Sequence, residues 1–211
     1  MVHQPDRGLH SRKATTTRRK EYKSYFAYGA NLSKSTLNRR GISVQNEGRV
    51  ARVVLQKHRL TFNHRTGYGN LEEDERAEVH GVVYELSEED WRKMQAAELG
   101  YRVKRVCLES YGTGALVEAL TFVSEDDVKI ISNDPSSLRP LTRYANLLRE
   151  GAHYHDLDQD YQKMLRELKT NESIPTEYYQ TKRSRKTKGI LSSIVFMLCL
   201  AAAAALSHSK L

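Results

Sequence analysis

Cysteine is scarce in this 211-residue chain, and a secretory leader and an internal repeat are missing. The two cysteines, Cys107 and Cys199, lie far apart and lack the spacing of metal ligands, which excludes a disulfide-rich scaffold or a zinc module. Cys107 lies in a strand-like run, so we expect a buried, inert thiol. No apolar segment follows Met1, which argues against a secretory signal peptide.

Acidic residues are missing from the last part of the chain, and this makes the net charge of +8 misleading. Residues 1–23 hold seven Lys/Arg and two acids, and residues 182–211 hold six Lys/Arg and no acid. The remaining residues, 24–181, therefore carry 21 bases and 24 acids, a net charge of −3. A nucleic-acid-binding domain needs a basic face on its folded part, so we expect no nucleic-acid partner.

The two ends of the chain differ from its centre and from each other. Residues 1–23 are basic and lack apolar periodicity, which predicts a disordered tail, with an organelle transit peptide as the alternative. Residues 189–206 contain no charged residue and follow a basic linker, 171–188, whose last residues are rich in Lys and Arg. Eighteen helical residues span about 27 Å, close to the bilayer core. We therefore predict a transmembrane tail anchor with the preceding domain facing the cytosol, rather than a buried core helix.

The last three residues carry a competing signal. Ser209-Lys210-Leu211 matches the peroxisomal address, which is read on an exposed C-terminus. Residues 207–211 are all that would follow the membrane span. A peroxisomal location is therefore the alternative to a simple tail anchor.

The segment 25–32, YFAYGANL, is the most informative stretch between the tails. A short aromatic run stops at Gly29, and helix-start residues follow at Asn31 and Ser33. This order predicts a strand–turn–helix corner. Such a corner directs backbone N–H groups at one point, where a carboxylate or an oxyanion can bind.

Three segments, in this order, resemble the gamma-glutamylcyclotransferase family. YFAYGANL is similar to the family's Tyr-Gly-Ser-Asn-Leu signature, with Ala30 in place of the serine. VHGVVYEL at 79–86 precedes a helix that ends near Glu98 and Tyr101, where the family carries its catalytic glutamate. The third segment, YANLLREGA at 144–152, resembles the family's C-terminal tyrosine, helix and Gly-Ala corner.

The resemblance implies a fold and a reaction. The fold class is α+β, a small closed mixed β-barrel flanked by helices over residues 24–170, followed here by the C-terminal transmembrane helix. The reaction would release 5-oxoproline and an amine or amino acid from a small γ-glutamyl compound, with neither cofactor nor metal. A γ-glutamylamine cyclotransferase acting on isopeptides and a non-catalytic γ-glutamyl-binding module are the alternatives.

The resemblance also assigns residues. Glu98 would be the general acid–base, and Glu109 and Glu85 are the alternatives if the register differs. The substrate-binding residues would be Tyr28, Gly29, Ala30, Asn31, Leu32, Tyr101 and Tyr144.

Local patterns predict the elements of this domain. We expect strands at 24–28, 49–55, 58–62, 79–85, 102–110 and 115–123, and helices at 33–40, 88–97, 138–150 and 157–169. Short connections at 56–57 and 112–114 favour antiparallel hairpins. Ser87 with Asp90 predicts a helix start, and Gly151 predicts a helix end.

Two groups of candidate metal ligands are weaker signals. The acids within 63–78 are consecutive and cannot all point into one site, so we predict a solvated charged loop. His153 and His155 lie at a predicted turn between helices, which favours a surface position over a metal site.

Overall fold

The protein is described from a computed structural model, in which residues 22–44, 50–65 and 67–173 are placed. Five strands form a closed barrel in the order β1-β3-β2-β4-β5. The strands are β1 (Tyr22–Ala27), β2 (Ala51–His64), β3 (Tyr68–Ser87), β4 (Tyr101–Ser110) and β5 (Leu116–Ser124). Their pairings are antiparallel except for β1 with β5, a parallel contact that closes the barrel at Tyr25 and Leu120. The closed mixed barrel that the family resemblance implied is therefore confirmed.

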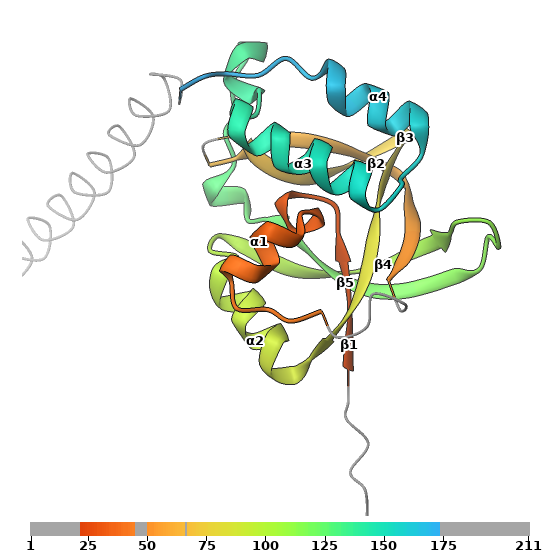
Figure 1. Cartoon of the computed structure of the whole chain (residues 1–211). Coiled ribbons are helices and arrows are strands. Elements are labelled where there is room, and N and C mark those ends of the chain that lie inside the picture. The colour runs from red at the N-terminus through yellow and green to blue at the C-terminus, as the bar shows by residue number, and fades with distance from the viewer. Residues whose placement is uncertain (1–21, 45–49, 66, 174–211) are drawn as a thin grey trace, which may run out of the picture.

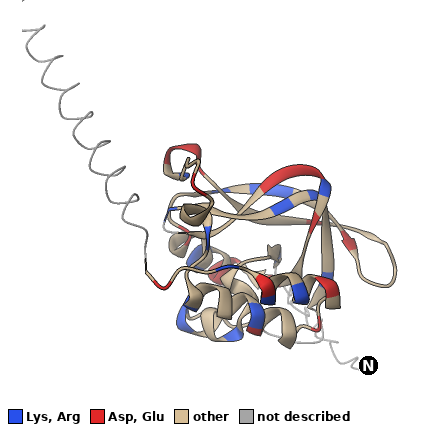
Figure 2. Ribbon diagram, turned by 90° about the horizontal axis from the view of Figure 1, so that it is seen from above, with Lys and Arg blue, Asp and Glu red and all other residues tan. Residues whose placement is uncertain are grey.

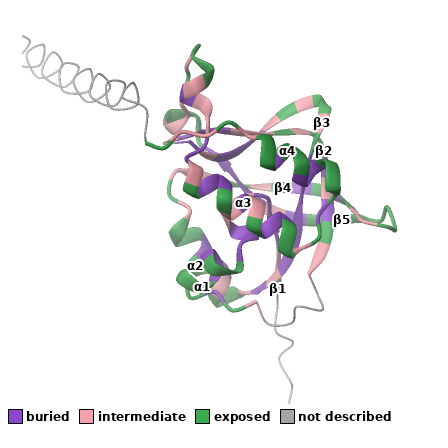
Figure 3. Ribbon diagram, turned by 45° about the horizontal axis from the view of Figure 1, so that its top comes forward, coloured by how far each residue is buried: buried purple, intermediate pink, exposed green. Residues whose placement is uncertain are grey.

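Helices flank the barrel. They are α1 (Lys34–Arg39), α2 (Glu88–Ala97), α3 (Thr142–Tyr154) and α4 (Gln159–Glu167), with short 3-10 turns η1 (Ala30–Leu32), η3 (Asp126–Val128) and η4 (Pro135–Leu138). In Figure 1, α3 and α4 lie over one end of the barrel, α1 and α2 lie along its flank, and the β4–β5 hairpin extends away. Figure 3 shows buried and exposed residues alternating along α3 and α4, as expected of helices that pack by one face.

The core explains why these segments fold together. Phe26, Leu32, Leu86, Met94 and Leu148 are almost completely buried, and they come from β1, η1, β3, α2 and α3 in turn. The predicted start of α2 is confirmed, because Ser87 Oγ accepts a hydrogen bond from the Asp90 amide at 3.1 Å. One core cluster thus joins the barrel to its helices, which fixes where the strand ends meet.

The predicted charged loop at 63–78 and the predicted hairpin at 56–57 are wrong. Strands β2 and β3 run through both segments, and the chain reverses between His64 and Tyr68. Lys57 instead forms an irregularity with a φ of 58° inside β2. The acids of β3 are solvated and meet bases across the strands: Glu75 pairs with Lys57 at 2.7 Å and Glu72 with Arg59 at 2.9 Å.

Three further predictions need correction. Gly151 does not end its helix: α3 continues to Tyr154, and a Cβ at Gly151 would collide with Leu32. The predicted helix at 138–150 begins only at Thr142, after η4 and Pro140. Cys107 is exposed rather than buried, because Val106 and Leu108 take the inward positions of β4.

The predicted membrane anchor at 189–206 and residues 1–21 of the predicted disordered tail at 1–23 lie outside the described residues. The last two residues of that tail, Tyr22 and Lys23, belong to β1, where they pair with Ser87 and Leu86 of β3. Within the described ranges, no helix combines the length and the apolar character that crossing a membrane requires.

Candidate active site

A cavity of about 880 Å³ opens where the end of β1, the α2–β4 junction and the start of α3 meet. Seven of the eight residues predicted to form the site line it: Tyr28, Gly29, Ala30, Asn31, Glu98, Tyr101 and Tyr144. Leu32 does not line the cavity. Its side chain is buried in the core, and its amide donates to the Gly29 carbonyl at 2.9 Å. The alternatives for the acid–base, Glu85 and Glu109, also lie outside the lining.

The strand–turn–helix corner is present at the predicted place. Strand β1 ends at Ala27, and the chain passes through Tyr28 and Gly29 into η1. The Tyr28 hydroxyl donates to the Phe122 carbonyl of β5 at 2.6 Å, which holds the corner against the barrel. Gly29 has a negative φ of −112°, so a glycine is needed there for close approach: a Cβ would lie 2.9 Å from the Tyr144 hydroxyl oxygen.

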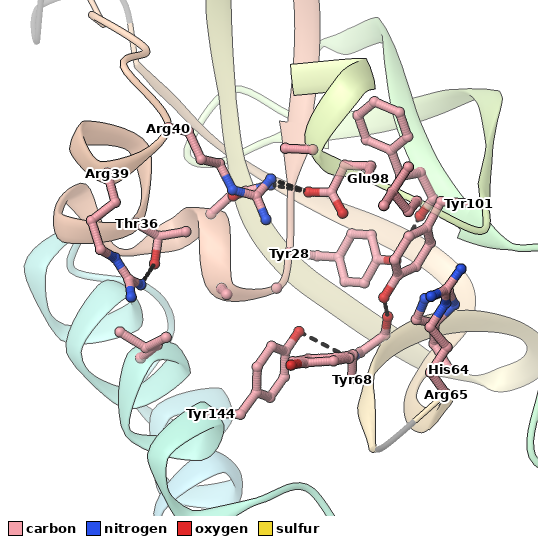
Figure 4. Close-up of a pocket in the computed structure, with 18 of the residues that line it drawn as sticks. Tyr28, Thr36, Arg39, Arg40, His64, Arg65, Tyr68, Glu98, Tyr101 and Tyr144 are labelled. Carbon is pink, nitrogen blue, oxygen red and sulfur yellow. Dashed lines mark hydrogen bonds and ion pairs between the residues drawn. The ribbon is translucent and has the colours of Figure 1, made fainter. Parts of the chain in front are cut away.

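Glu98 lies at the carboxyl end of α2, where the helix turns into β4. The turn is made by the Tyr101 amide, which donates to the Glu98 carbonyl at 3.2 Å, and by Gly100 with a φ of +79°. The Glu98 carboxylate accepts a hydrogen bond from Asn31 Nδ2 at 2.9 Å and forms an ion pair with Arg40. Its side chain is 12% exposed, so a fixed carboxylate faces the cavity beside the corner (Figure 4).

The side-chain amide of Asn31 has its nitrogen paired and its oxygen unpaired. Its Nδ2 group also donates to the Tyr25 hydroxyl at 2.7 Å, whereas its Oδ1 atom is buried and has no hydrogen-bond partner among the described residues. The carboxylate of Glu98 determines this orientation of the amide, because a carboxylate can only accept. Leaving such an acceptor unpaired costs about 1–3 kcal/mol, so the orientation of Asn31 toward Glu98 is held at the expense of stability.

The Tyr144 hydroxyl can donate a hydrogen bond into the cavity. Its oxygen accepts from the Gly69 amide at 3.0 Å, and among the described residues no acceptor takes its own proton. Burial raises the pKa of Tyr144 to about 12, with the charge of Glu98 adding to the effect and backbone amides opposing it. A neutral phenol at this position is a hydrogen-bond donor toward the cavity.

Tyr101 is a wall of the cavity rather than a donor into it. Its hydroxyl donates to the Gly69 carbonyl at 2.7 Å, and its ring stacks on His64 with centroids 3.6 Å apart. Burial raises the pKa of Tyr101 and also that of Tyr28. Both phenols therefore remain neutral and structural.

Sequence reasoning missed His64 and the charged rim of the cavity. His64 is buried, its Nδ1 lies 2.8 Å from Ser124 Oγ, and burial together with Arg65 lowers its pKa to about 4. The rim carries four arginines: Arg39, Arg40, Arg65 and Arg143. No local pattern marks these residues, because they come from α1, the β2–β3 turn and α3. Among the described residues, no group of three or more His, Cys, Asp or Glu could hold a metal ion.

Comparison with known proteins now identifies the family. The model of the family described as gamma-glutamyl cyclotransferase, AIG2-like, matches residues 25–144, more than half of the chain. The chain belongs to this family. The match covers both the corner and the α2–β4 junction, the two segments that form the inner end of the cavity.

Solved structures share the gamma-glutamyl cyclotransferase fold. A protein named gamma-glutamyl cyclotransferase superposes with a TM-score of 0.60 at 20% identity, covering 78% of this chain and 99% of its own. The uncharacterized human protein loc79017 gives 0.60 at 21% identity, with 76% and 98% covered. YkqA from Bacillus subtilis gives 0.58 at 20% identity, with 72% and 57% covered. At these identities the likeness establishes the fold alone. No curated protein matches the sequence.

Proposed function

We propose that this protein is a γ-glutamyl cyclotransferase that converts a γ-glutamyl compound into 5-oxoproline and a free amine or amino acid. One observation carries the proposal: the Glu98 carboxylate lines the cavity beside the strand–turn–helix corner and is held there by Asn31 Nδ2 and Arg40. It offers an acceptor to an ammonium group, which is the group that must lose a proton in this reaction. Family membership supports a cyclotransferase-type enzyme.

The reaction needs no nucleophile from the protein. The substrate's α-amino nitrogen attacks its own δ-carbonyl carbon, a new C–N bond closes the five-membered lactam, and the original amide C–N bond breaks. The attacking nitrogen loses two protons as the α-ammonium group becomes the lactam N–H, and the leaving nitrogen gains two as the amide N–H becomes a free ammonium group, so a single acid–base group can carry protons from one nitrogen to the other. Because attack is intramolecular, holding the glutamyl chain folded removes much of the entropic barrier.

Each residue of the inner end has a task in this mechanism. Glu98 accepts a proton from the α-ammonium group and delivers one to the leaving nitrogen. Asn31 orients the Glu98 carboxylate through the 2.9 Å hydrogen bond from its Nδ2 atom. The Tyr144 hydroxyl donates to the α-carboxylate or to the oxyanion that forms on the δ-carbonyl, together with those corner amides that are not already bonded within the corner, as the Leu32 amide is to the Gly29 carbonyl.

Arg40 holds the proposed acid–base in position. Its guanidinium forms an ion pair with Glu98, and it also contacts the Met94 sulfur at 3.3 Å. An arginine at this place keeps the carboxylate in one rotamer, which suits proton transfer over a short distance.

The test is direct. Purified full-length protein is incubated with a panel of γ-glutamyl amino acids, peptides and amines, including the isopeptide γ-glutamyl-ε-lysine, and 5-oxoproline is measured. We expect 5-oxoproline and an equal amount of released amine from at least one compound. Release only from isopeptides would make the protein a γ-glutamylamine cyclotransferase. Binding without any release would favour a non-catalytic module.

We also propose that residues 189–206 anchor the enzyme in a membrane with its domain in the cytosol. The support is the uncharged stretch and the basic run before it. Full-length protein should stay with membranes through alkaline carbonate washing, and a chain ending at Thr181 should be soluble and equally active. Recovery of full-length protein in the peroxisomal matrix, dependent on Leu211, would instead favour the address at the C-terminus.

A further inference from the structure

The mouth of the cavity carries unbalanced positive charge. Its charged lining consists of the four arginines and Glu98. Arg40 is paired with Glu98, whereas Arg39, Arg65 and Arg143 form no ion pair with any acid of the described residues. We call these three residues the rim arginines. Figure 4 shows Arg39 and Arg65 on opposite sides of the cavity, with Tyr28 between them.

The rim arginines hold positions that the fold itself does not favour. Arg143 lies in the first turn of α3, where a positive charge opposes the helix dipole. Arg65 has a φ of 47°, which is costly for a residue other than glycine, and its Nε atom is buried without a partner among the described residues. Within the described part of the chain, the Arg39 guanidinium makes a single hydrogen bond, 3.3 Å long, to Thr36 of its own helix. A bound anion would offset the unfavourable charge of Arg143 at the start of α3 and would give Arg39 an acidic partner.

Outside the cavity, positive and negative charges are mixed over the surface of the domain. Figure 2 shows acidic and basic residues interleaved along the helices and long strands. Several surface bases there form ion pairs with acids, as Lys93 does with Glu89 at 2.8 Å and Arg105 with Glu118 at 3.3 Å. Residues 24–181 are acidic overall. The positive rim is therefore local to the cavity.

We propose that the preferred substrates are γ-glutamyl compounds whose amine portion carries two or more carboxylates, such as γ-glutamyl-glutamate. This inference rests on the proposed function. The glutamyl head carries one ammonium and one carboxylate, so it leaves the rim charge uncompensated. Guanidinium groups bind carboxylates with paired hydrogen bonds, and they disfavour a cationic or zwitterionic amine at the same place. The rim arginines thus select the leaving amine while the inner end holds the glutamyl head.

Two substrates of equal shape test this selection. γ-Glutamyl-glutamate and γ-glutamyl-glutamine differ by one negative charge. We expect kcat/KM to be about tenfold higher for the first, and the ratio to shrink as salt is added, because the rim is exposed to solvent. The double variant Arg39→Gln/Arg143→Gln should lower the ratio to about two or less. Arg105→Gln, which removes one positive charge from the outside of the barrel, should leave the ratio unchanged.

A binding measurement separates this inference from the catalytic proposal. N-glutaryl-glutamate and N-glutaryl-glutamine lack the α-amine and cannot cyclise, so calorimetry on the wild-type protein reports binding alone. A roughly tenfold tighter Kd for the glutamate analogue, lost in the double variant, supports the rim selection even if no compound is turned over. Equal kcat/KM for the two substrates, equal Kd for the two analogues, no binding of either, or a preference that survives in the double variant would overturn it.

Discussion

The inner end and the mouth of the cavity differ in how far their polar groups are buried and in whether these groups have partners. The inner end consists of buried groups with prescribed partners: Glu98, Asn31, Tyr101 and Tyr144 are tied to one another, to backbone groups or to Arg40. The mouth consists of cationic side chains without acidic partners among the described residues. Groups withdrawn from water interact strongly and hold a fixed geometry, whereas exposed charges interact weakly and remain adaptable. The proposed chemistry therefore belongs to the inner end and the proposed selectivity to the mouth.

Among the substitutions that test this contrast, replacement of Glu98 should have the largest effect on turnover. Glu98→Gln preserves the shape of the side chain and removes the proton acceptor, so we expect turnover to fall by roughly 10²–10⁴. Production of 5-oxoproline measures the loss, and a normal thermal unfolding profile shows that the fold survives. Glu118→Gln on the outside of β5 is the matched control and should be fully active. Near-normal turnover of Glu98→Gln would remove Glu98 from the mechanism.

The second largest loss of activity should come from a larger side chain at Gly29 in the strand–turn–helix corner. Gly29→Val places methyl groups where even a Cβ would lie 2.9 Å from the Tyr144 hydroxyl oxygen, so the corner or the phenol must move. We expect kcat/KM to fall by about 10², because small misplacements of catalytic groups are costly. Ala115→Val, an addition of similar size at the exposed β4–β5 turn, should have no effect.

A second variant, Gly29→Ala, tests whether the Tyr144 hydroxyl is the reason why position 29 needs a glycine. Gly29→Ala should lower the midpoint of thermal unfolding in the wild-type background and much less in Tyr144→Phe, where the colliding oxygen is gone. Equal destabilisation in both backgrounds would show that Tyr144 does not enforce the glycine.

Acid stability should depend on His64. The folded protein holds the pKa of His64 at about 4, below its ordinary 6.5, so the unfolded chain binds a proton there that the folded chain does not. Stability from this group is therefore complete above pH 6.5 and is lost as the pH falls toward 4, by roughly 2–3 kcal/mol. Urea unfolding across this range should show a shallower loss in His64→Gln than in wild type or in His153→Gln, a control at an exposed histidine. An unchanged slope would contradict the assignment.

The smallest expected effect is the loss of one donor. Tyr144→Phe removes the hydroxyl proton that we assign to the substrate, and one such hydrogen bond supports about a tenfold change in kcat/KM. The same variant leaves the Gly69 amide without its acceptor, so a modest loss of stability should accompany it. Tyr22→Phe at the start of β1 is the control. A loss of stability with unchanged kcat/KM would make Tyr144 a purely structural residue.

Local sequence was a good guide where the structure is decided by neighbours in the chain. The aromatic run, Gly29 and the polar residues after it predicted the corner, and Ser87 with Asp90 predicted the start of α2. Seven of the eight residues assigned to the site by family resemblance line one cavity. The roles of these residues remain predictions for the experiments above.

Other features were decided only by contacts between distant segments. The acids of 63–78 look like a loop in sequence, yet cross-strand partners such as Lys57 and Arg59 make them a strand. Gly151 predicted a helix end, but α3 continues to Tyr154. The glycine is needed there because a Cβ would collide with Leu32, against which the helix packs. Cys107 lies in an apolar run whose alternation turns it outward.

The sequence by itself determined the corner, the helix that ends at Glu98 and the family, because each rests on a short run of residues with strong local preferences. The tertiary structure alone decided that Tyr144 lies between Gly29 and Gly69, that Asn31 leaves an acceptor unpaired beside Glu98, and that arginines from three elements share one rim. These contacts join residues up to 115 positions apart (Gly29 to Tyr144), and only the closure of the barrel brings them together.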